Sequence, residues 1–336
     1  MDNLPYCYFP SKIVCIDDSQ DALNIIKMAV DKKIASYEFF HNPMQALNYL
    51  SKKDKPAILF DRVLGTSGYP LDEKIIYELY QEIYNSQRYD VISCVIVDYA
   101  MPGMTGLELC NQIKDPSIKK ILLTGIAEEE LVIEAFNKGL IDFYIRKHDP
   151  KAYDLLEKYI YESQCKYFKS LTEIHINAVL KNWITFDKDI TALFDPMFIE
   201  YFKSFIKENN IIEYYLRDLN GSFVCLNTKG KISSLYVFNE SSFEENEEEV
   251  KEAINSSPNL SNDAVKDLKH RRKTICFPFD YDTSFFKSSN LDKYIYPLQT
   301  LEGQRRYYIA HATEVDYLEQ DKILNFSQYK KSGPST

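Results

Sequence analysis

Short apolar runs alternate with amphipathic segments along the first half of the chain. The apolar runs have the length of buried strands, and they cover residues 12–16, 37–40, 91–98, 119–124 and 141–147. Segments with apolar residues three and four positions apart lie between them and predict helices over 20–30, 43–50, 106–114 and 128–137. Buried strands that alternate with helices are typical of a parallel, doubly wound sheet. We therefore predict an α/β fold with a five-stranded parallel sheet for this half.

The pattern changes in the second half. Helical spacing continues from 152 to about 180 and again over 187–210. After Ile211, apolar and polar residues alternate, and turn pairs such as Asn220-Gly221, Lys229-Gly230 and Glu302-Gly303 predict hairpins. A helix is expected over Val315–Asn325, before a polar tail. This half is therefore predicted to be an α+β domain with an antiparallel sheet.

These changes divide the chain into four predicted regions. They are an α/β domain at 1–150, a helical connector at 151–186, an α+β output domain at 187–328 and a tail at 329–336. Residues 54–90 interrupt the first domain as an insertion, with a possible strand over 56–64 and a helix over 71–84. Two roles for the insertion are open, namely extra packing at the sheet edge and a contact surface for a kinase or a dimer.

Composition narrows the class of protein. The chain has 336 residues, 45% of them hydrophobic and 27% charged, and a formal net charge of -10. Such a charge provides no overall basic field for nucleic acid or anionic membrane. The longest apolar runs are far shorter than a membrane span, and residues 1–12 lack the pattern of a signal peptide. We expect a cytoplasmic protein that does not enter the membrane.

Cysteine and histidine spacing argues against a zinc site. The seven cysteines are scattered and contain no C-x-x-C pair, and the five histidines have no zinc-ligand spacing. The cysteines are predicted to be reduced, small hydrophobic residues.

Polar residues follow the predicted parallel strands at the points where they end. Asp17 and Asp18 follow the first strand, Asp98 ends the third, Thr124 ends the fourth and Lys147 ends the fifth. In a doubly wound sheet, ligands bind outside the carboxyl ends of the strands, where these side chains would meet. Crowded carboxylates repel one another, and a hard divalent cation relieves that repulsion. The sequence therefore predicts an acidic cleft with one hydroxyl and one ammonium group.

Mg²⁺ suits such a cleft, because it takes oxygen ligands from a few carboxylates and keeps positions for water and phosphoryl oxygens. An aspartate in the cleft can attack phosphorus and form an aspartyl phosphate. Lys147 would offset the negative charge of the phosphoryl oxygens, and Thr124 would donate a hydrogen bond to one of them.

The cleft resembles that of the receiver domain of two-component response regulators, over about residues 11–165. The matching elements are the acidic pair Asp17-Asp18, Asp98 in VDYAMPGMTGLEL, Thr124 in ILLTG and Lys147 in FYIRK. The resemblance implies a CheY/flavodoxin-like fold, a sensor histidine kinase as phosphoryl donor and a homodimer on phosphorylation.

The resemblance also implies roles for single residues. Asp98 would be the phosphoacceptor, Asp18 a direct Mg²⁺ ligand, Asp17 a ligand through water, and the backbone carbonyl of Ala100 a further ligand. Tyr144 matches the aromatic residue whose rotamer reports phosphorylation, although a tyrosine in so aromatic a chain is as readily a core residue.

The chain departs from the family pattern in two further places. Asp61 in AILFDRV lies nearer the usual distance from Asp18 than Asp98 does, but no proline and glycines follow it to form the turn that brings backbone around a metal. The turn after Asp98 has them, and we therefore prefer Asp98. His148 replaces the proline that usually follows the lysine, which puts the loop geometry at that position in question.

The output half contains no convincing enzyme motif. A basic stretch at 269–273 and the pair Arg305-Arg306 could contact phosphate, although such runs are more often solvated. The overall layout is similar to that of the α-hydroxyketone quorum-sensing response regulators, which implies control of a growth-phase or virulence programme. Two alternatives are a phosphorylation-independent scaffold or ligand-sensing module, loosely similar to a PAS fold, and a nucleic-acid-binding or nuclease-like output domain.

Overall fold

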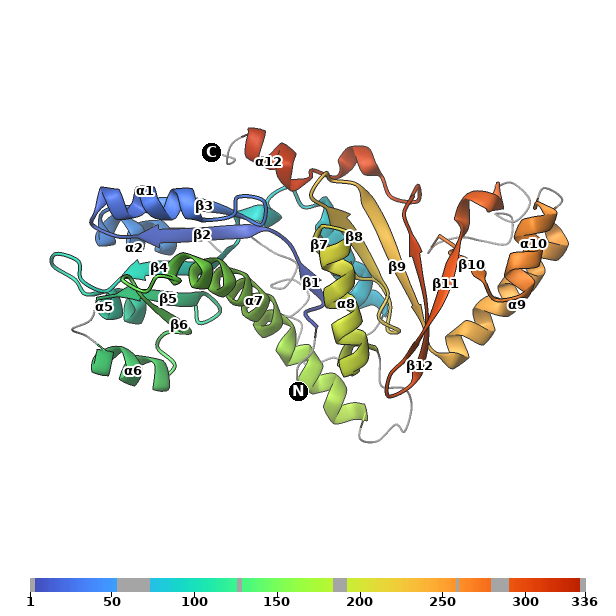
Figure 1. Cartoon of the computed structure of the whole chain (residues 1–336), viewed down its shortest axis with the longest axis horizontal. Coiled ribbons are helices and arrows are strands. Elements are labelled where there is room, and N and C mark those ends of the chain that lie inside the picture. Colours follow the sequence, from blue (N-terminus) through green and yellow to red (C-terminus); the bar gives the residue numbers. More distant parts are fainter. Residues whose placement is uncertain are drawn as a thin grey trace. The chain divides into compact units, whose positions relative to one another are not determined.

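The computed structural model describes residues 4–52, 73–125, 129–183, 192–257, 260–278 and 290–332. The chain forms two compact units (Figure 1). The first, called here the parallel-sheet unit, comprises Tyr8–Tyr69, Asn85–Ala178 and Phe326–Thr336. The second, called the antiparallel-sheet unit, comprises Met1–Cys7, Pro70–Tyr84 and Val179–Asn325.

The parallel-sheet unit is built on five parallel strands in the order β3-β2-β4-β5-β6. The strands are β2 (Ser11–Ile16), β3 (Ala35–Phe40), β4 (Ile92–Asp98), β5 (Lys119–Thr124) and β6 (Phe143–Arg146). This is the strand order of flavodoxin-like sheets, in which the switch point between β2 and β4 creates a crevice at the carboxyl edge. The predicted α/β class is confirmed.

Helices cover both faces of the parallel sheet. One face packs against α2 (Pro43–Lys52), α5 (Gly106–Gln112) and α6 (Glu129–Asn137), and the other against α1 (Gln20–Ala29) and the first half of α7 (Ala152–Trp183). Successive strand residues point to opposite faces, so Val14 joins the first core and Ile13 and Cys15 join the second. A 3-10 turn, η2 (Arg88–Asp90), precedes β4, and the short helix α12 (Phe326–Ser332) completes the unit.

The antiparallel-sheet unit contains a seven-stranded sheet in the order β1-β7-β8-β9-β12-β11-β10. The strands are β1 (Cys7–Tyr8), β7 (Ile211–Leu216), β8 (Phe223–Asn227), β9 (Ile232–Phe238), β10 (Lys273–Ile275), β11 (Ile295–Glu302) and β12 (Arg306–Ala312). The predicted hairpins at Gly221, Gly230 and Gly303 join β7 to β8, β8 to β9 and β11 to β12. The predicted antiparallel sheet is confirmed, and the sequence did not predict β1 at its edge.

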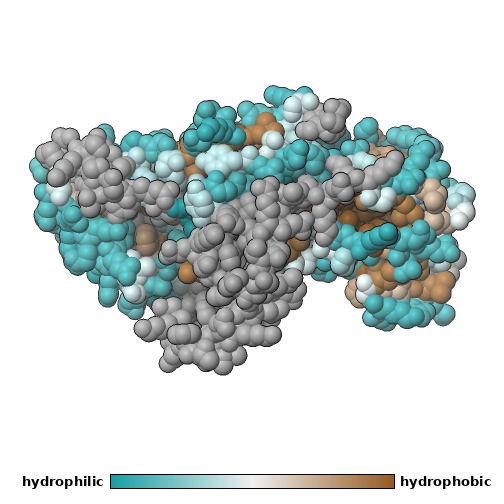
Figure 2. Space-filling view, turned by 180° about the vertical axis from the view of Figure 1, so that it is seen from behind, coloured by the Kyte–Doolittle hydropathy of each residue, from teal (hydrophilic) through white to brown (hydrophobic). Residues whose placement is uncertain are grey.

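Aromatic side chains hold helices on this second sheet. Phe202 of α8 (Pro196–Glu208) lies 4.4 Å between ring centroids from Phe223, and Phe243 of α9 (Glu240–Ser256) stacks on Tyr308 at 3.9 Å. The other helical elements are α4 (Glu73–Gln81), η1 (Glu82–Tyr84), η3 (Ala192–Phe194), α10 (Asn262–Lys269), η4 (Leu291–Tyr294) and η5 (Gln320–Lys322). The surface of α9 and α10 is hydrophilic, as the teal region at the left edge of Figure 2 shows.

The insertion does not add to the parallel sheet. Its described helix, α4, belongs to the antiparallel-sheet unit and packs against β7, with Ile76 and Leu79 buried. The remainder, including the possible strand over 56–64 and Asp61, lies outside the described residues. The expectation of extra packing at the parallel sheet is therefore wrong for α4, whereas η2, at the end of the insertion, packs against β2.

The helix expected over Val315–Asn325 is also wrong, because only the 3-10 turn η5 forms there. Tyr317 Oη lies 2.6 Å from Ser234 Oγ, and both carboxylate oxygens of Asp316 accept hydrogen bonds from Tyr294. These contacts hold Asp316 and Tyr317 against different partners, so this segment does not form the helix that its apolar spacing predicts. The last described helix begins only at Phe326.

The compact units do not follow the continuous ranges expected from the sequence. The chain crosses between the units several times, so residues 1–7 and 70–84 lie in the antiparallel-sheet unit and residues 326–336 in the parallel-sheet unit. Within the described residues, no helix is long and apolar enough to cross a membrane.

Candidate functional site

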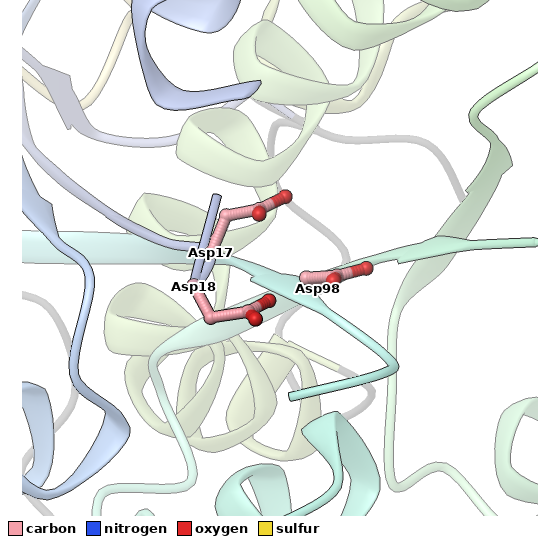
Figure 3. Close-up of side chains that lie close together, drawn as sticks. All are labelled: Asp17, Asp18 and Asp98. Carbon is pink, nitrogen blue, oxygen red and sulfur yellow. The ribbon is translucent and has the colours of Figure 1, made fainter. Parts of the chain in front are cut away.

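The five side chains predicted to meet at the carboxyl edge of the parallel sheet all lie at strand ends. Asp17 follows β2, Asp98 is the last residue of β4, Thr124 is the last residue of β5 and Lys147 follows β6. Figure 3 shows that the carboxylates of Asp17, Asp18 and Asp98 leave neighbouring strand ends and point to the same side. The parallel register places residues far apart in sequence at one edge.

The three carboxylates form a tight cluster. Asp17, Asp18 and Asp98 each offer one oxygen, and these oxygens lie within 4.8 Å of one another. Asp17 and Asp98 are buried, whereas Asp18 is exposed, so the cluster opens to solvent on one side. Asp17 Oδ1 accepts a hydrogen bond from the backbone N–H of Ser19 at 2.9 Å, which fixes its side chain at the start of α1.

Lys147 provides the positive charge of the site. Its Nζ lies 2.8 Å from Asp17 Oδ2 and 2.8 Å from Asp98 Oδ1. Burial alone would lower the pKa of Lys147, but the hydrogen bonds to the two carboxylates raise it above its usual value. Lys147 is therefore a permanent cation that holds Asp17 and Asp98 together.

Asp98 has a raised pKa. Burial is the main cause, the charge of Asp17 adds to it, and the contacts with Lys147 and the Ala100 backbone oppose it. One lysine against three carboxylates leaves the cleft with an excess of about two negative charges. The donor set of clustered carboxylate oxygens with an open side fits a hard divalent cation such as Mg²⁺.

The loop after Asp98 depends on glycine at one position. A Cβ on Gly106 would lie 2.3 Å from the carbonyl oxygen of Asp98 and 2.8 Å from Leu122 Cδ1, so only glycine fits there. Thr105 then begins α5 with a capping box, because its hydroxyl accepts from the Glu108 N–H and the Glu108 carboxylate accepts from the Thr105 N–H. The sequence indicated a turn here, but it did not indicate this close contact.

The remaining predicted residues lie around the cluster. Thr124 is buried, and its hydroxyl donates to the carbonyl of Gly125 at 3.0 Å. Tyr144 is half-buried and lies edge-on to Phe136, which is 46% exposed on α6. Ala100 is exposed at the start of the loop. Tyr144 therefore lies between the core and the surface.

His148 stands where the family has a proline. It is exposed, and the Lys147–His148 peptide bond is trans. Even so, Lys147 reaches both buried aspartates, and its backbone N–H donates to the Thr124 carbonyl at 2.9 Å. The substitution therefore leaves the lysine in place.

The basic stretch of the output half is largely neutralised within its own unit. Arg271 makes a two-pronged ion pair with Glu247 at 2.7 Å, and Arg272 and Lys273 both pair with Asp267. Arg306 pairs with Glu302. These ion pairs offset part of the positive charge of the two basic stretches, and nucleic-acid binding stays a prediction.

Comparison with known proteins gives consistent results. The family described as the response regulator receiver domain matches residues 76–158. The chemotaxis protein CheY of Listeria monocytogenes is 33% identical over 79 residues, which cover 22% of this chain and 66% of that protein. The transcriptional regulatory protein ResD of Bacillus subtilis is 30% identical over 105 residues, which cover 30% of this chain and 42% of ResD.

One solved structure is similar over both units. The response regulator LqsR of Legionella pneumophila is 32% identical, with a TM-score of 0.75, and the match covers 98% of this chain and 97% of that one. At this identity and coverage, the relationship extends beyond the receiver fold to the antiparallel-sheet unit. The chain belongs to the response-regulator family.

Proposed function

We propose that the chain is a phosphorylation switch in which Asp98 accepts a phosphoryl group from a sensor histidine kinase. The observation that carries the proposal is the cluster of three carboxylates, two of them paired with Lys147, at the carboxyl edge of a receiver sheet. A structural role alone does not explain it, because crowded carboxylates repel one another and burial of ionised Asp98, which raises its pKa, opposes folding.

In the proposed reaction, one carboxylate oxygen of Asp98 attacks the phosphorus of a phosphohistidine or a small phosphodonor. A new P–O bond forms, the bond to the leaving group breaks, and the leaving group retains the electron pair. Lys147 offsets charge on the phosphoryl oxygens, and Thr124 turns its hydroxyl from Gly125 toward one of them.

A magnesium ion would be held by Asp17, Asp18, Asp98 and the backbone carbonyl of Ala100. When bound, it supplies positive charge that offsets the carboxylates and the incoming phosphoryl oxygens. Asp18 is the exposed carboxylate of the cluster, and it is therefore the ligand that a magnesium ion entering from solvent would meet first.

The proposed output is a change at α6 and β6 that favours a homodimer. As Thr124 moves toward the phosphoryl group, it vacates space that Tyr144 can enter, and Tyr144 contacts the exposed Phe136 on α6. By analogy with the family layout, we place this switch in quorum sensing or virulence control.

Intact-mass spectrometry tests the phosphorylation. Wild type, Asp98→Asn and the control Asp263→Asn are incubated with acetyl phosphate and MgCl₂; Asp263 is exposed on α10, in the antiparallel-sheet unit. Wild type and the control should gain one phosphate, and Asp98→Asn should gain none. Equal uptake by Asp98→Asn would refute the assignment. Light scattering of the phosphorylated sample tests the dimer.

A ligand-sensing role remains the second candidate, and one observation favours it. The antiparallel-sheet unit has a pocket of about 320 Å³ at one end of its sheet, with Ile232, Tyr294 and Val315 buried in its lining and Lys231 and Glu314 exposed there. This size is at the lower end for small-ligand sites. If ligand binding alone drives output, the dimer should form equally in Asp98→Asn.

A further inference from the structure

The last described helix, α12, belongs to the third segment of the chain that lies in the parallel-sheet unit. Asn325 belongs to the antiparallel-sheet unit, and Phe326 belongs to the parallel-sheet unit. In its own unit Asn325 packs closely on a turn, because a Cβ on Gly230 would lie 2.5 Å from Asn325 Nδ2. The chain therefore passes from one unit to the other between two neighbouring residues that are each held in place.

Two aromatic side chains one helical turn apart anchor α12. Phe326 is 2% exposed and Tyr329 is 5% exposed. Both contact the ring of Tyr89, which is fully buried, at centroid distances of 5.1 Å and 5.2 Å. The other face of α12, with Ser327 and Lys331, is exposed. One side of this short helix thus makes the entire apolar contact.

A polar contact fixes the position of α12. The Tyr329 hydroxyl donates to Asp90 Oδ1 at 2.8 Å, and the same oxygen accepts from Lys12 Nζ at 2.9 Å. Lys12 is 2% exposed, and its distance to the other nearby carboxylate, Glu38, is 3.8 Å. Asp90 is therefore the nearer of these two carboxylates to a buried lysine, and Tyr329 donates to the same Asp90 oxygen.

Lys330 adds a third, directional contact. Its Nζ donates to the backbone carbonyl of Lys32 at 2.7 Å and lies 4.8 Å from the centre of the Phe326 ring. The surface around Tyr89 and Asp90 therefore matches a short segment with the pattern Phe-x-x-Tyr-Lys: rings for the first and fourth positions, an acceptor for the hydroxyl and a carbonyl for the ammonium.

The helix is too short to persist by itself. α12 has seven residues, whereas isolated helices shorter than about 12–15 residues are marginal in water. Its helical form therefore depends on the docking contacts, and an element with few anchors opens more readily than the strands beneath it.

We propose that Phe326–Ser332 is a detachable clasp, and that the surface at Tyr89 and Asp90 is a recognition site for this Phe-x-x-Tyr-Lys segment. When docked, the clasp covers the ring of Tyr89 and donates a hydrogen bond to Asp90. When released, it exposes the Tyr89 surface. This inference does not depend on phosphorylation of Asp98.

Hydrogen exchange on the full chain tests the docking. In wild type, the amides of α12 should exchange at least tenfold faster than those of β2 and β4, through local opening. The double variant Phe326→Ala/Tyr329→Ala should lose protection in α12 and around residues 88–92, and keep it in β5 and β6. The control Ser327→Ala/Lys331→Ala alters only the exposed face and should match wild type. Unchanged protection in the double variant, or α12 opening only together with the strands, would overturn the proposal.

A peptide of residues 324–332 tests recognition. Added to the double variant, it should restore protection around residues 88–92, whereas the same peptide with both alanines should not. A wild-type peptide that restores nothing would show that the surface does not recognise the segment. If the double variant loses protection in all strands, the single variant Tyr329→Phe is used in its place. The amides of α12 should then exchange several-fold faster than in wild type, and an unchanged exchange rate would contradict the proposal.

Discussion

Replacing Asp98 by asparagine should stabilise the parallel-sheet unit when divalent metal is absent. Asparagine has nearly the same shape, so Asp98→Asn removes one negative charge and leaves the packing of the cleft unchanged. The change removes repulsion by Asp17 and Asp18, and it also weakens the attraction to Lys147. The sign of the effect depends on which of these is larger.

The distances show that the charge interactions almost cancel. At an effective dielectric constant of about 20, two unit charges 4.8 Å apart interact by about 3.5 kcal/mol; because the carboxylate oxygens lie within 4.8 Å, the two carboxylates together repel Asp98 by at least about 7 kcal/mol. The ion pair with Lys147 at 2.8 Å contributes about 6 kcal/mol in the other direction. Desolvation of the buried Asp98 carboxylate then decides the sign, and it is unfavourable. We expect a gain of about 1–2 kcal/mol for Asp98→Asn.

The gain should depend on pH. Since burial raises the folded-state pKa of Asp98, the folded protein holds that proton more tightly than the unfolded chain does. Ionised Asp98 therefore opposes folding above its raised pKa, and this opposition disappears as the pH falls below the ordinary aspartate value. The advantage of Asp98→Asn should be full at pH 7 and should shrink in acid.

Hydrogen exchange of β2 and β4 measures the effect for this unit alone. At pH 7 in EDTA, a gain of 1–2 kcal/mol corresponds to roughly 5- to 30-fold slower exchange in the variant. Saturating MgCl₂ should protect wild type more than the variant, because bound ligand stabilises the form that binds it. Faster exchange of Asp98→Asn in EDTA would refute the charge argument.

Three further changes test the construction of the site. Lys147→Met leaves two buried carboxylates without their cation, so the amides of β4 should exchange faster. The free energy of opening should fall by roughly 1–3 kcal/mol, because the lysine is partly exposed, and MgCl₂ should restore part of this stability. Gly106→Ala should abolish phosphate uptake by intact mass, because the methyl group would press on the Asp98 carbonyl. The control Gly139→Ala also strains the backbone, because Gly139 has a φ of +70°, but its methyl group meets no other atom within 4 Å, and it should retain uptake. Thr105→Ala removes the capping box of α5 and should destabilise the unit by about 1 kcal/mol in urea titration while phosphorylation persists.

The acidic cleft could be predicted from the sequence because each strand end carries its own local signal. An apolar run that ends on an acidic pair or on a threonine fixes both the strand and the side chain at its edge. The strand order and parallel direction then bring those ends together, so Asp17, Asp98 and Lys147 converge without any further information. The contact between Gly106 and the Asp98 carbonyl was not predictable, because it depends on the path of the loop.

The division into units was less predictable, because it depends on contacts between distant segments. Helix α4 has an ordinary amphipathic pattern, and nothing in that pattern identifies the sheet that covers its apolar side. The same holds for Phe326 and Tyr329, whose spacing indicates one apolar side of a helix and leaves its receptor open. Spacing predicts that a residue is buried, and only the fold determines where.

The strands that carry the acidic edge are held at their opposite ends by a buried polar network. Ser11 Oγ lies 2.6 Å from Ser93 Oγ and accepts from Gln164 Nε2 at 2.8 Å, and Gln164 Oε1 in turn accepts from the Tyr8 hydroxyl at 3.0 Å. Gln164 lies on α7, beyond residues 76–158 that match the receiver family. A fragment cut to that match would lack β2 as well as Gln164, and it would leave the buried Ser93 hydroxyl without its Ser11 partner, which is unfavourable. The Asp98 chemistry of this chain should therefore be measured on the full chain, in which both ends of β2 and β4 keep their partners.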